Sequence, residues 1–300
     1  MMNWRLIFAY AGVVFVWSTT PLMVKLSTHS LSVPAATGLR MLLACFISMS
    51  LLAYLRQALP LDRRSLASYA AANLGMFGSL SLTYQAVQTI PTGLVSVIFG
   101  LAPVLSGTFA HFILHERNLT PMRALALLLA IAGLGLVFEG ALEVDPSAWP
   151  GLILALVATA LFALGSVLVK AWARHLDPVQ HTTGSLILSL PLFFASWLLL
   201  DRTLPSQLSA TSVGATVYLA IIGSVLAFVL YFQVLRHTTA VQAALIPVMT
   251  PVLALYWGHW LLNEEPPASA LYGAMLILLG LSLYQFGAQL RQWLVTRRAS

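Results

Sequence analysis

The sequence predicts an all-α polytopic membrane protein with ten transmembrane helices, arranged as two inverted five-helix repeats. The first observation is the composition: the 300 residues are 59% hydrophobic and only 8% charged, with a mean hydropathy of +0.88. Soluble domains carry about 25% charged residues, so this chain has too few polar side chains to cover a surface in water. The second observation is an internal repeat, and the third is the distribution of charge between successive loops.

The internal repeat is clearest in residues 102–116 and 250–264. Both segments contain Pro-Val-Leu, a histidine eight residues after the proline, and a glutamate five residues later. At the same offset of 148, residues 75–116 share ten identities with residues 223–264, where this composition gives roughly three by chance. The pairs are Gly75/Gly223, Leu82/Leu230, Gln85/Gln233, Ile98/Ile246, Pro103/Pro251, Val104/Val252, Leu105/Leu253, His111/His259, Leu114/Leu262 and Glu116/Glu264. We therefore interpret the chain as two copies of one unit.

The helices of the first half follow from apolar runs of about 20 residues, the length that crosses a bilayer. They are expected at residues 4–26, 34–57, 66–88, 93–115 and 121–138. The first run lacks a small-residue cleavage pattern, so we expect a retained helix rather than a removed signal peptide. Pro34 and Pro121 suit the first turns of their helices, and residues 90–92 form a tight turn.

The helices of the second half repeat this order. They are expected at residues 149–174, 178–200, 213–235, 241–262 and 268–290. Pro178 suits a first turn, and the turn at residues 237–239 matches the one at 89–91. The predicted organisation is a first repeat at residues 1–141, a connecting loop at 142–148, a second repeat at 149–291 and a cytoplasmic tail at 292–300.

The charge distribution supports the inversion. Five helices are an odd number, so two consecutive copies face opposite sides of the membrane, as in many secondary transporters. With the N-terminus in the cytoplasm, 12 of the 15 basic residues fall on the inner side and only Lys25, Arg40 and Arg202 on the outer side. Both termini are then cytoplasmic. The isoelectric point near 9.8 is explained by membrane orientation rather than by nucleic-acid binding.

Three prolines inside expected helices are candidates for a ligand path. Pro103, Pro247 and Pro251 have no backbone N–H, so each frees a carbonyl one turn earlier. A freed carbonyl is tolerated in a membrane where protein or a water-filled cavity satisfies it. The sequence leaves open whether these carbonyls serve a polar ligand or belong to packed kinks.

Glutamine and aromatic side chains are further candidates. Gln85 and Gln233 either face a cavity or join helices through hydrogen bonds. Trp17 and Phe162 lie mid-span in the first helix of each repeat, although many aromatic residues in such chains form interface belts or packing. The complete predicted substrate-binding set is Trp17, Tyr84, Gln85, Ser96, Phe99, Pro103, Phe162, Ser166, Tyr231, Gln233, Gln242, Pro247 and Pro251.

Ionisable residues bear on mechanism. Lys25, Arg40 and Lys170 lie one or two turns from helix ends, so we expect their charges to extend to the membrane interface. His111 and His259 are either hydrogen-bonded structural residues or a proton relay. No Asp or Glu falls near the middle of an expected helix, which favours facilitated transport or coupling through histidine.

Several enzyme and pump classes lack their motifs here. Cys45 is the single cysteine, which excludes an internal disulfide and a cysteine-based metal site. The sequence contains no Walker A, His-Glu-x-x-His or Gly-x-Ser-x-Gly motif. His29, His175 and Asp177 flank turns without forming a recognisable catalytic group. We expect no catalytic residue, metal or cofactor.

Taken together, the spans, the two halves and the repeated Pro-Val-Leu…Glu segment resemble the EamA-type branch of the drug/metabolite transporter superfamily, over residues 6–290. The resemblance implies a ten-helix carrier in which helices 1, 3, 4, 6, 8 and 9 line a central cavity. Bacterial members of that branch typically export amino acids and related metabolites across the inner membrane. The sequence is also similar to the YddG-type exporters of aromatic and hydrophobic amino acids.

The expected function is therefore export of amino acids, or related small metabolites, by alternating access in a bacterial inner membrane. The expected partners are a small-molecule substrate and membrane lipid, with no nucleic acid. A monomer is expected to suffice, with an oligomer as the open alternative. One alternative is a nucleotide or sugar derivative as cargo, which would require basic residues facing the cavity. A membrane-embedded enzyme is the alternative from another class.

Overall fold

The computed structural model describes residues 4–114, 121–173, 176–202, 207–243, 246–263, 265, 267–269, 271–280 and 282–283. All regular elements within these ranges are helices, and six segments of them are long and apolar enough to cross a membrane. Shorter apolar helices lie at Ile131–Gly140 and Leu271–Gly280. The predicted all-α polytopic membrane fold is confirmed. The count of ten spans and the repeat boundaries stay predictions.

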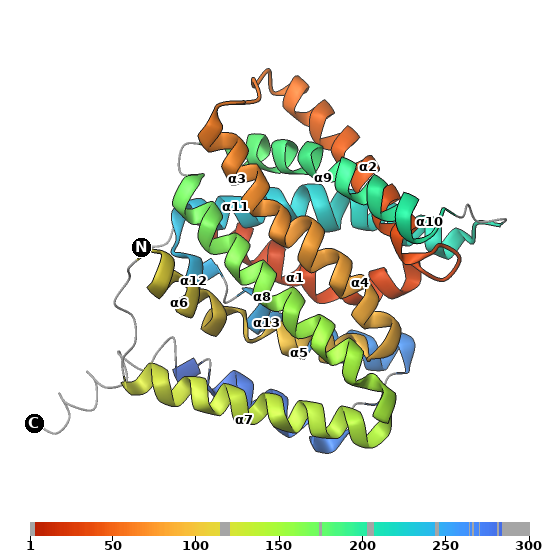
Figure 1. The fold of residues 1–300 in the computed structure, drawn as a ribbon, viewed down its shortest axis with the longest axis vertical. Coiled ribbons are helices and arrows are strands. Elements are labelled where there is room, and N and C mark those ends of the chain that lie inside the picture. Colours follow the sequence, from red (N-terminus) through yellow and green to blue (C-terminus); the bar gives the residue numbers. More distant parts are fainter. Residues whose placement is uncertain are drawn as a thin grey trace, which may run out of the picture.

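The elements follow one another along the chain without a strand in the described ranges (Figure 1). They are α1 (Trp4–Ser27), α2 (Val33–Tyr54), α3 (Arg63–Asn73), η1 (Leu74–Ser79), α4 (Leu80–Thr89), α5 (Thr92–Phe99), α6 (Ala102–Ile113), α7 (Pro121–Val144), η2 (Pro146–Ala148), α8 (Trp149–Trp172), α9 (Pro178–Leu200), α10 (Ala210–Tyr218), η3 (Leu219–Leu226), α11 (Ala227–His237), α12 (Ala240–Ala243) and α13 (Ile246–Leu262). Here η1 and η3 are π-helical, and η2 is a single 3₁₀ turn.

Polar caps determine where several helices begin. The Asp62 carboxylate accepts hydrogen bonds from the backbone N–H groups of Arg64 and Ser65, both at 3.2 Å, so α3 begins at Arg63 rather than at the expected residue 66. A further hydrogen bond from the Ser65 hydroxyl is the main cause that lowers the pKa of the Asp62 carboxyl. Ser209 caps α10 in the same way, which moves its start to Ala210.

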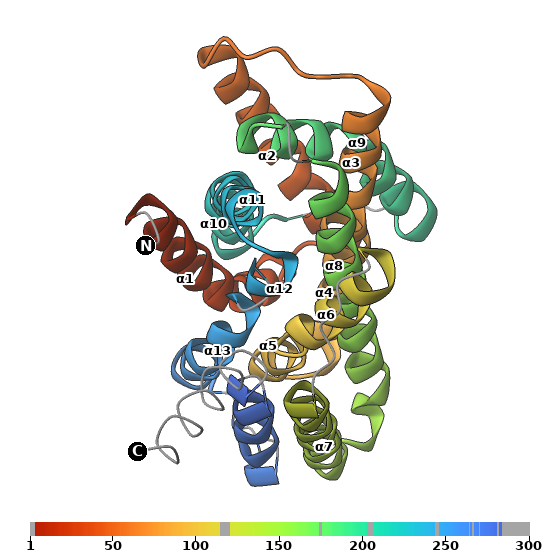
Figure 2. The same cartoon turned by 90° about the vertical axis from the view of Figure 1, so that its left-hand side faces the viewer.

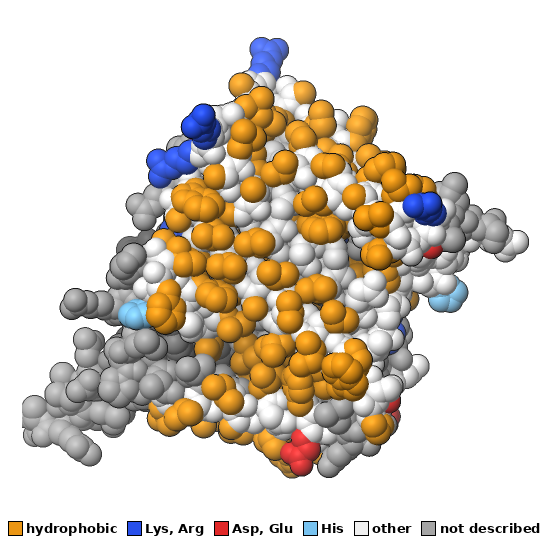
Figure 3. Space-filling model, viewed as in Figure 1, with side chains coloured by type: hydrophobic (Ala, Val, Ile, Leu, Met, Phe, Trp, Pro, Cys, Tyr) orange, Lys and Arg blue, Asp and Glu red, His pale blue; other side chains and the backbone are white. Residues whose placement is uncertain are grey.

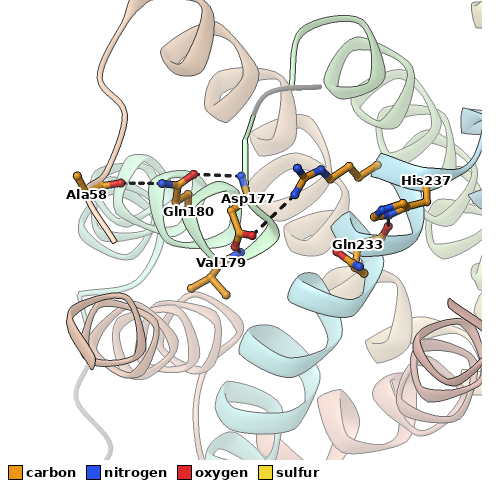
Figure 4. Close-up of polar contacts among 7 residues, drawn as sticks. Ala58, Asp177, Val179, Gln180, Gln233 and His237 are labelled. Carbon is orange, nitrogen blue, oxygen red and sulfur yellow. Dashed lines mark hydrogen bonds and ion pairs between the residues drawn. The ribbon is translucent and has the colours of Figure 1, made fainter. Parts of the chain in front are cut away.

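The start of α9 is bonded to two other parts of the chain, the segment at Ala58 and helix α11 (Figure 4). Asp177 and Gln180 form a capping box, in which each side chain accepts a hydrogen bond from a backbone N–H of the helix start. The Gln180 amide also donates to the carbonyl of Ala58 at 2.9 Å, and Asp177 pairs with Arg236 of α11 at 3.8 Å. The ion pair is partly exposed, so it contributes at most about 1 kcal/mol.

The helices pack around α1 and α8 (Figures 1 and 2). α1 contacts α13, α11 and α10, whereas α8 crosses α3, η1, α4 and α6. α2 lies along α9 and also packs on η3. The view in Figure 2 shows α7 at one margin of the bundle, beside the helix at Leu271–Gly280.

Two glycines allow α7 and the 271–280 helix to approach closely. A Cβ added at Gly133 would lie 2.6 Å from the carbonyl oxygen of Gly273, and one added at Gly273 would lie 2.5 Å from the carbonyl oxygen of Gly133. Small residues of this kind let helix backbones meet in membranes, where no hydrophobic force drives helices together. The contact therefore depends on glycine at both positions.

The surface is that of a protein immersed in lipid. Figure 3 shows hydrophobic side chains across the described part of one face, with charged side chains at its margins. Large apolar residues are widely exposed, among them Phe8, Phe46 and Leu199 at 70%, 72% and 75%. Soluble monomers rarely expose contiguous apolar surface on this scale.

Some predicted features lie outside the described residues. They are Glu116 and Glu264 of the repeated segment, residues 284–290 at the end of the last expected helix, and the tail at 292–300.

Candidate functional site

A cavity of about 660 Å³ opens between helices of both halves of the chain. This volume counts the space at the open mouth of the cavity as well as its enclosed part. The lining residues are Trp17, Thr20, Pro21, Arg40, Gly75, Ser79, Leu80, Thr83, Val95, Ser96, Phe99, Phe162, Gly223, Phe228, Pro247 and Thr250. The walls therefore come from α1, α2, η1, α4, α5, α8, η3, α11 and α13.

Two π-helical segments shape the cavity, one in each half. η1 contains Gly75 and η3 contains Gly223, the glycine pair that the 148-residue offset aligns, and both glycines line the cavity. π-helical turns are rare and occur frequently at functional sites. The sequence comparison identified the glycine pair but gave no sign of the π-helical backbone around it.

The helix interruption before Pro103 forms another part of the wall. α5 ends at Phe99, and the chain resumes as α6 at Ala102, so the expected single helix at 93–115 consists of two helices. Phe99 lies at this break and faces the cavity, whereas Pro103 is buried at the start of α6 and is not part of the lining. The proline starts the second helix, in the first-turn position that suits it.

The carbonyl of Pro247 has a partner within its own helix. Pro251 has no N–H to donate to it, and the Thr250 hydroxyl donates instead, at 2.8 Å. Thr250 is only 4% exposed and lines the cavity together with Pro247. The side chain of Pro251 lies outside the described part of the structure.

An aromatic cluster forms one side of the cavity. The ring of Trp17 lies 5.4 Å from that of Phe162 in an edge-to-face arrangement and 5.0 Å from that of Tyr231. Phe162 also contacts Phe99, with centroids 6.2 Å apart. Such pairs contribute about 0.5–1.5 kcal/mol each beyond their buried area. The cluster therefore presents a preformed apolar wall.

A hydrogen-bond chain orients this cluster. The Ser166 hydroxyl donates to the carbonyl of Phe162 at 2.7 Å, so its oxygen accepts the hydroxyl proton of Tyr231 at 2.6 Å. Both side chains are buried. Ser166 and Tyr231 thus support the lining from behind.

Arg40 is the one charged side chain among the described lining residues, and it corrects the expectation of an interfacial charge. The residue is 1% exposed and hydrogen-bonds inside the bundle instead of extending to the interface. Its Nε donates to Ser224 Oγ at 2.9 Å, and its Nη2 donates to the carbonyl of Gly223 at 3.1 Å. The charge does not reach the interface because the Arg40 side chain points from α2 toward η3, and not toward lipid.

Tyr84 is a further residue in contact with the guanidinium of Arg40. Its hydroxyl lies 3.4 Å from Nη1, and its ring centroid lies 5.9 Å from the guanidinium carbon. Tyr84 is fully buried and does not itself line the cavity. It therefore positions the guanidinium through a weak hydrogen bond and a cation–π contact.

The predicted substrate-binding residues divide into those near the cavity and those away from it. Trp17, Ser96, Phe99, Phe162 and Pro247 line it, whereas Tyr84, Ser166 and Tyr231 support the lining. Their role in binding stays a prediction. The lining also contains residues that were not predicted from the sequence: Arg40, the small polar residues Thr20, Ser79, Thr83 and Thr250, and the glycine pair.

The three predicted glutamines lie elsewhere in the described structure. Gln85 is exposed near the end of α4. Gln233 is half-buried on α11, where its backbone carbonyl contacts His237 Nδ1 at 2.9 Å (Figure 4). Gln242 exchanges hydrogen bonds with Thr239 and caps the start of α12. None of the three belongs to the cavity lining.

The candidate relay histidines also lie away from the cavity. His111 is half-buried, with its ring 5.2 Å from that of Phe112, and His259 is exposed. Neither residue is part of the lining. The proton-relay hypothesis stays a prediction.

The family model described as "EamA-like transporter family" matches the chain twice, over residues 4–139 and 149–285. The chain is similar to "Uncharacterized transporter YoaV" of Bacillus subtilis, with 24% identity over 277 residues that cover 92% of this chain and 94% of the relative. It is also similar to a "Probable amino-acid metabolite efflux pump" of Salmonella typhimurium, with 27% identity over 289 residues that cover 93% and 94%.

Two further comparisons concern cargo and fold. An "S-adenosylmethionine/S-adenosylhomocysteine transporter" of Chlamydia muridarum is 24% identical over 288 residues, covering 90% of this chain and 88% of the relative. A solved crystal structure superposes with a TM-score of 0.70 at 18% identity, covering 96% of this chain and 100% of that one. At that level of identity the structure supports the fold alone.

Proposed function

The chain belongs to the EamA-like transporter family, and on that premise we propose that it exports amino acids or related small metabolites by alternating access, with aromatic and hydrophobic amino acids favoured. The observation that carries the proposal is the cavity between the two halves, with its preformed aromatic wall. An apolar side chain fits against Trp17, Phe99 and Phe162, and the hydroxyls of neighbouring Ser and Thr residues offer polar contacts.

The names of two relatives support the cargo class. The Salmonella relative is named for amino-acid metabolites, and the Chlamydia relative for S-adenosylmethionine, which itself contains an amino-acid unit. The likeness to YddG-type exporters adds aromatic side chains as the favoured kind, and the aromatic wall is consistent with it.

Alternating access is supported by the interrupted helices. Segments that border the cavity are π-helical in both halves, and the chain breaks between α5 and α6. Discontinuous helices near the midplane are typical of secondary transporters built from two repeats. Such interruptions allow the two halves to move against each other without stretching a continuous helix.

The proposed location is a bacterial inner membrane, and the proposed functional unit is the monomer. The charge distribution supports the placement of both termini in the cytoplasm. Cysteine labelling tests the orientation, starting from Cys45→Ser to remove the single native thiol. We expect Arg64→Cys to react only in permeabilised cells and Asp145→Cys to react in intact cells. The opposite pattern would reverse the orientation.

Transport is tested with purified protein in liposomes and radiolabelled phenylalanine, tryptophan, methionine and threonine, each with and without a pH gradient. Movement of none of them would refute the substrate class. We expect Trp17→Ala to lower uptake of the aromatic substrates about 10-fold, since it removes aromatic contacts of about 0.5–1.5 kcal/mol each. Trp149→Ala is the matched control, because Trp149 is 59% exposed at the start of α8 and not part of the lining.

A further inference from the structure

We infer that Arg40 is the carboxylate-binding residue of the cavity, and that the transported molecule carries a free carboxylate. The inference rests on the proposed function and deepens it, since it specifies which chemical group of the cargo the protein recognises. It starts from the burial of a full positive charge in the membrane interior, at 1% exposure. A charged side chain there is costly to bury, which makes a functional role the default expectation.

The surroundings of Arg40 are neutral in the described part of the chain. No carboxylate there lies within 4.0 Å of its nitrogens, and its hydrogen-bond acceptors are a serine hydroxyl, a backbone carbonyl and a tyrosine hydroxyl. A buried charge normally has an opposite charge beside it. An anionic group on the cargo would supply that charge.

The geometry of the guanidinium fits this role. The side formed by Nε and Nη2 is occupied by Ser224 and Gly223 on η3. Those two hydrogen bonds, with the longer one to Tyr84, use three of the five N–H groups. One N–H group of Nη1 and one of Nη2 have no hydrogen-bond partner among the described residues. Donors on these two nitrogens can bind both oxygens of a carboxylate.

The rest of the lining selects a carboxylate over a phosphate. A phosphate ester carries up to two negative charges, and Arg40 is the one cation among the described lining residues. The aromatic side chains Trp17, Phe99 and Phe162 line the same cavity. The site therefore suits a molecule with one carboxylate and an adjoining apolar group, which an apolar amino acid provides.

A purely structural role for Arg40 is the competing explanation, because its hydrogen bonds join α2 to η3. The two explanations differ in ligand selectivity, which wild-type protein can report without any substitution. Binding is followed by ligand-induced thermal stabilisation, and transport by competition with labelled phenylalanine. The probes are phenylalanine, 3-phenylpropionate, phenylalaninamide and phenethylamine, which share the ring and differ in the carboxylate.

We expect the two carboxylates to bind about 10- to 100-fold more tightly than the amide and the amine, the range for a charge-assisted hydrogen-bonded pair. Arg40→Gln should reduce that ratio to about one, and Arg40→Lys should leave an intermediate ratio because it keeps the charge and loses the paired N–H donors of the guanidinium. Arg64→Gln is the matched control, since it removes an exposed arginine at the start of α3.

The results of these experiments can refute the role of Arg40 and the proposed function independently. Equal binding of acid and amide by the wild type, an unchanged ratio in Arg40→Gln, or no binding of any carboxylate would overturn the inference. Binding of carboxylates that depends on Arg40, without any transport, would uphold the inference and refute the proposed function. If Arg40→Gln does not fold, Arg40→Lys and the wild-type series decide.

Discussion

The Thr250 hydroxyl is expected to stabilise the protein because Pro251 leaves the carbonyl of Pro247 without its usual donor. The hydroxyl donates to that carbonyl at 2.8 Å, and the side chain is 4% exposed. Thr250→Val keeps the shape of the side chain and removes the donor. A buried carbonyl left unsatisfied costs about 1–3 kcal/mol, so we expect the free energy of unfolding to fall by that amount.

The same substitution is expected to cost less once the backbone donor is restored. Pro251→Ala supplies an N–H one turn after Pro247, which can complete the helical hydrogen bond. In that background Thr250→Val loses one ordinary hydrogen bond, a net cost of about 0.5–1.5 kcal/mol. The double-mutant cycle should therefore show a coupling of about 1 kcal/mol between the two positions.

The assay is reversible unfolding of the four proteins in mixed detergent micelles, followed by circular dichroism. Equal costs of Thr250→Val in both backgrounds, within about 0.3 kcal/mol, would refute the reasoning, because positions that do not interact give additive costs. Transport by a fifth protein, with both Pro103 and Pro251 replaced by alanine, tests a second hypothesis. If Pro251→Ala combined with Pro103→Ala transports normally at normal expression, the prolines are not needed for function.

Two further predictions use glycine pairs as matched controls. Gly223→Ala would place a Cβ at a tight 3.2 Å from Leu219 Cδ2 and at 3.4 Å from Nη2 of Arg40, so we expect this crowding to disturb the contact between η3 and Arg40 and to lower uptake by up to about 10-fold. Gly75→Ala, whose Cβ would meet an aromatic carbon at an ordinary 3.8 Å, should keep uptake near wild type, and equal loss in both would contradict the explanation. Gly133→Ala would bring a Cβ within 2.6 Å of the facing helix backbone and should cost about 1–3 kcal/mol of stability. Gly135→Ala has nothing within 4 Å and should not lower the melting temperature.

The helices themselves could be predicted from the sequence because the hydropathy of a segment directly indicates whether it is buried in lipid. For nine of the expected helices, the structure describes an element at the start. The expected first residue of each lies within three positions of the observed one. The largest differences arose at Arg63 and Ala210, where Asp62 and Ser209 act as caps and extend the helix toward the loop. A cap adds polar residues that lower the hydropathy of the first turn, so the apolar run begins later than the helix.

The direction of the Arg40 side chain could not be predicted from the sequence in the same way. Hydropathy and distance from the helix end report depth in the membrane, whereas extension to the interface also requires a side chain that faces lipid. Which way a side chain points is set by packing, and α2 turns Arg40 toward η3. The exposed position of Gln85 has the same origin, since repeat identity marks a position as equivalent without giving its direction.

The π-helical segments were also beyond sequence reasoning. Gly75 and Gly223 appeared only as one identity among ten. A π-helical turn is a local change in hydrogen bonding whose cost must be offset by contacts with neighbouring helices. Those contacts, such as that of Arg40 with the carbonyl of Gly223, exist only in the folded bundle.

Arg40 also makes the two halves chemically unequal. Pro34 of α2 and Pro178 of α9 are 144 residues apart, and at this offset Arg40 corresponds to Gly184. Gly184 is buried under the ring of Tyr69, so closely that a Cβ would lie 2.4 Å from Tyr69 Cζ. At the position where the first half has a positive charge, the second half therefore has a glycine, packed against the ring of Tyr69 from the first half.

This inequality restricts how the two halves can move. Arg40 belongs to α2 in the first half of the chain, and its acceptors Ser224 and Gly223 belong to η3 in the second. Motion that separates α2 from η3 would break two hydrogen bonds of a buried charge, each worth about 1.5–3 kcal/mol. Motion that keeps them together carries the charge, and any anion bound to it, as one body with η3. The cost difference favours the second kind. The cavity helices expected to move relative to the bound cargo are therefore those without a contact to Arg40 that are not continuous with η3, namely α1, α5, α8 and α13.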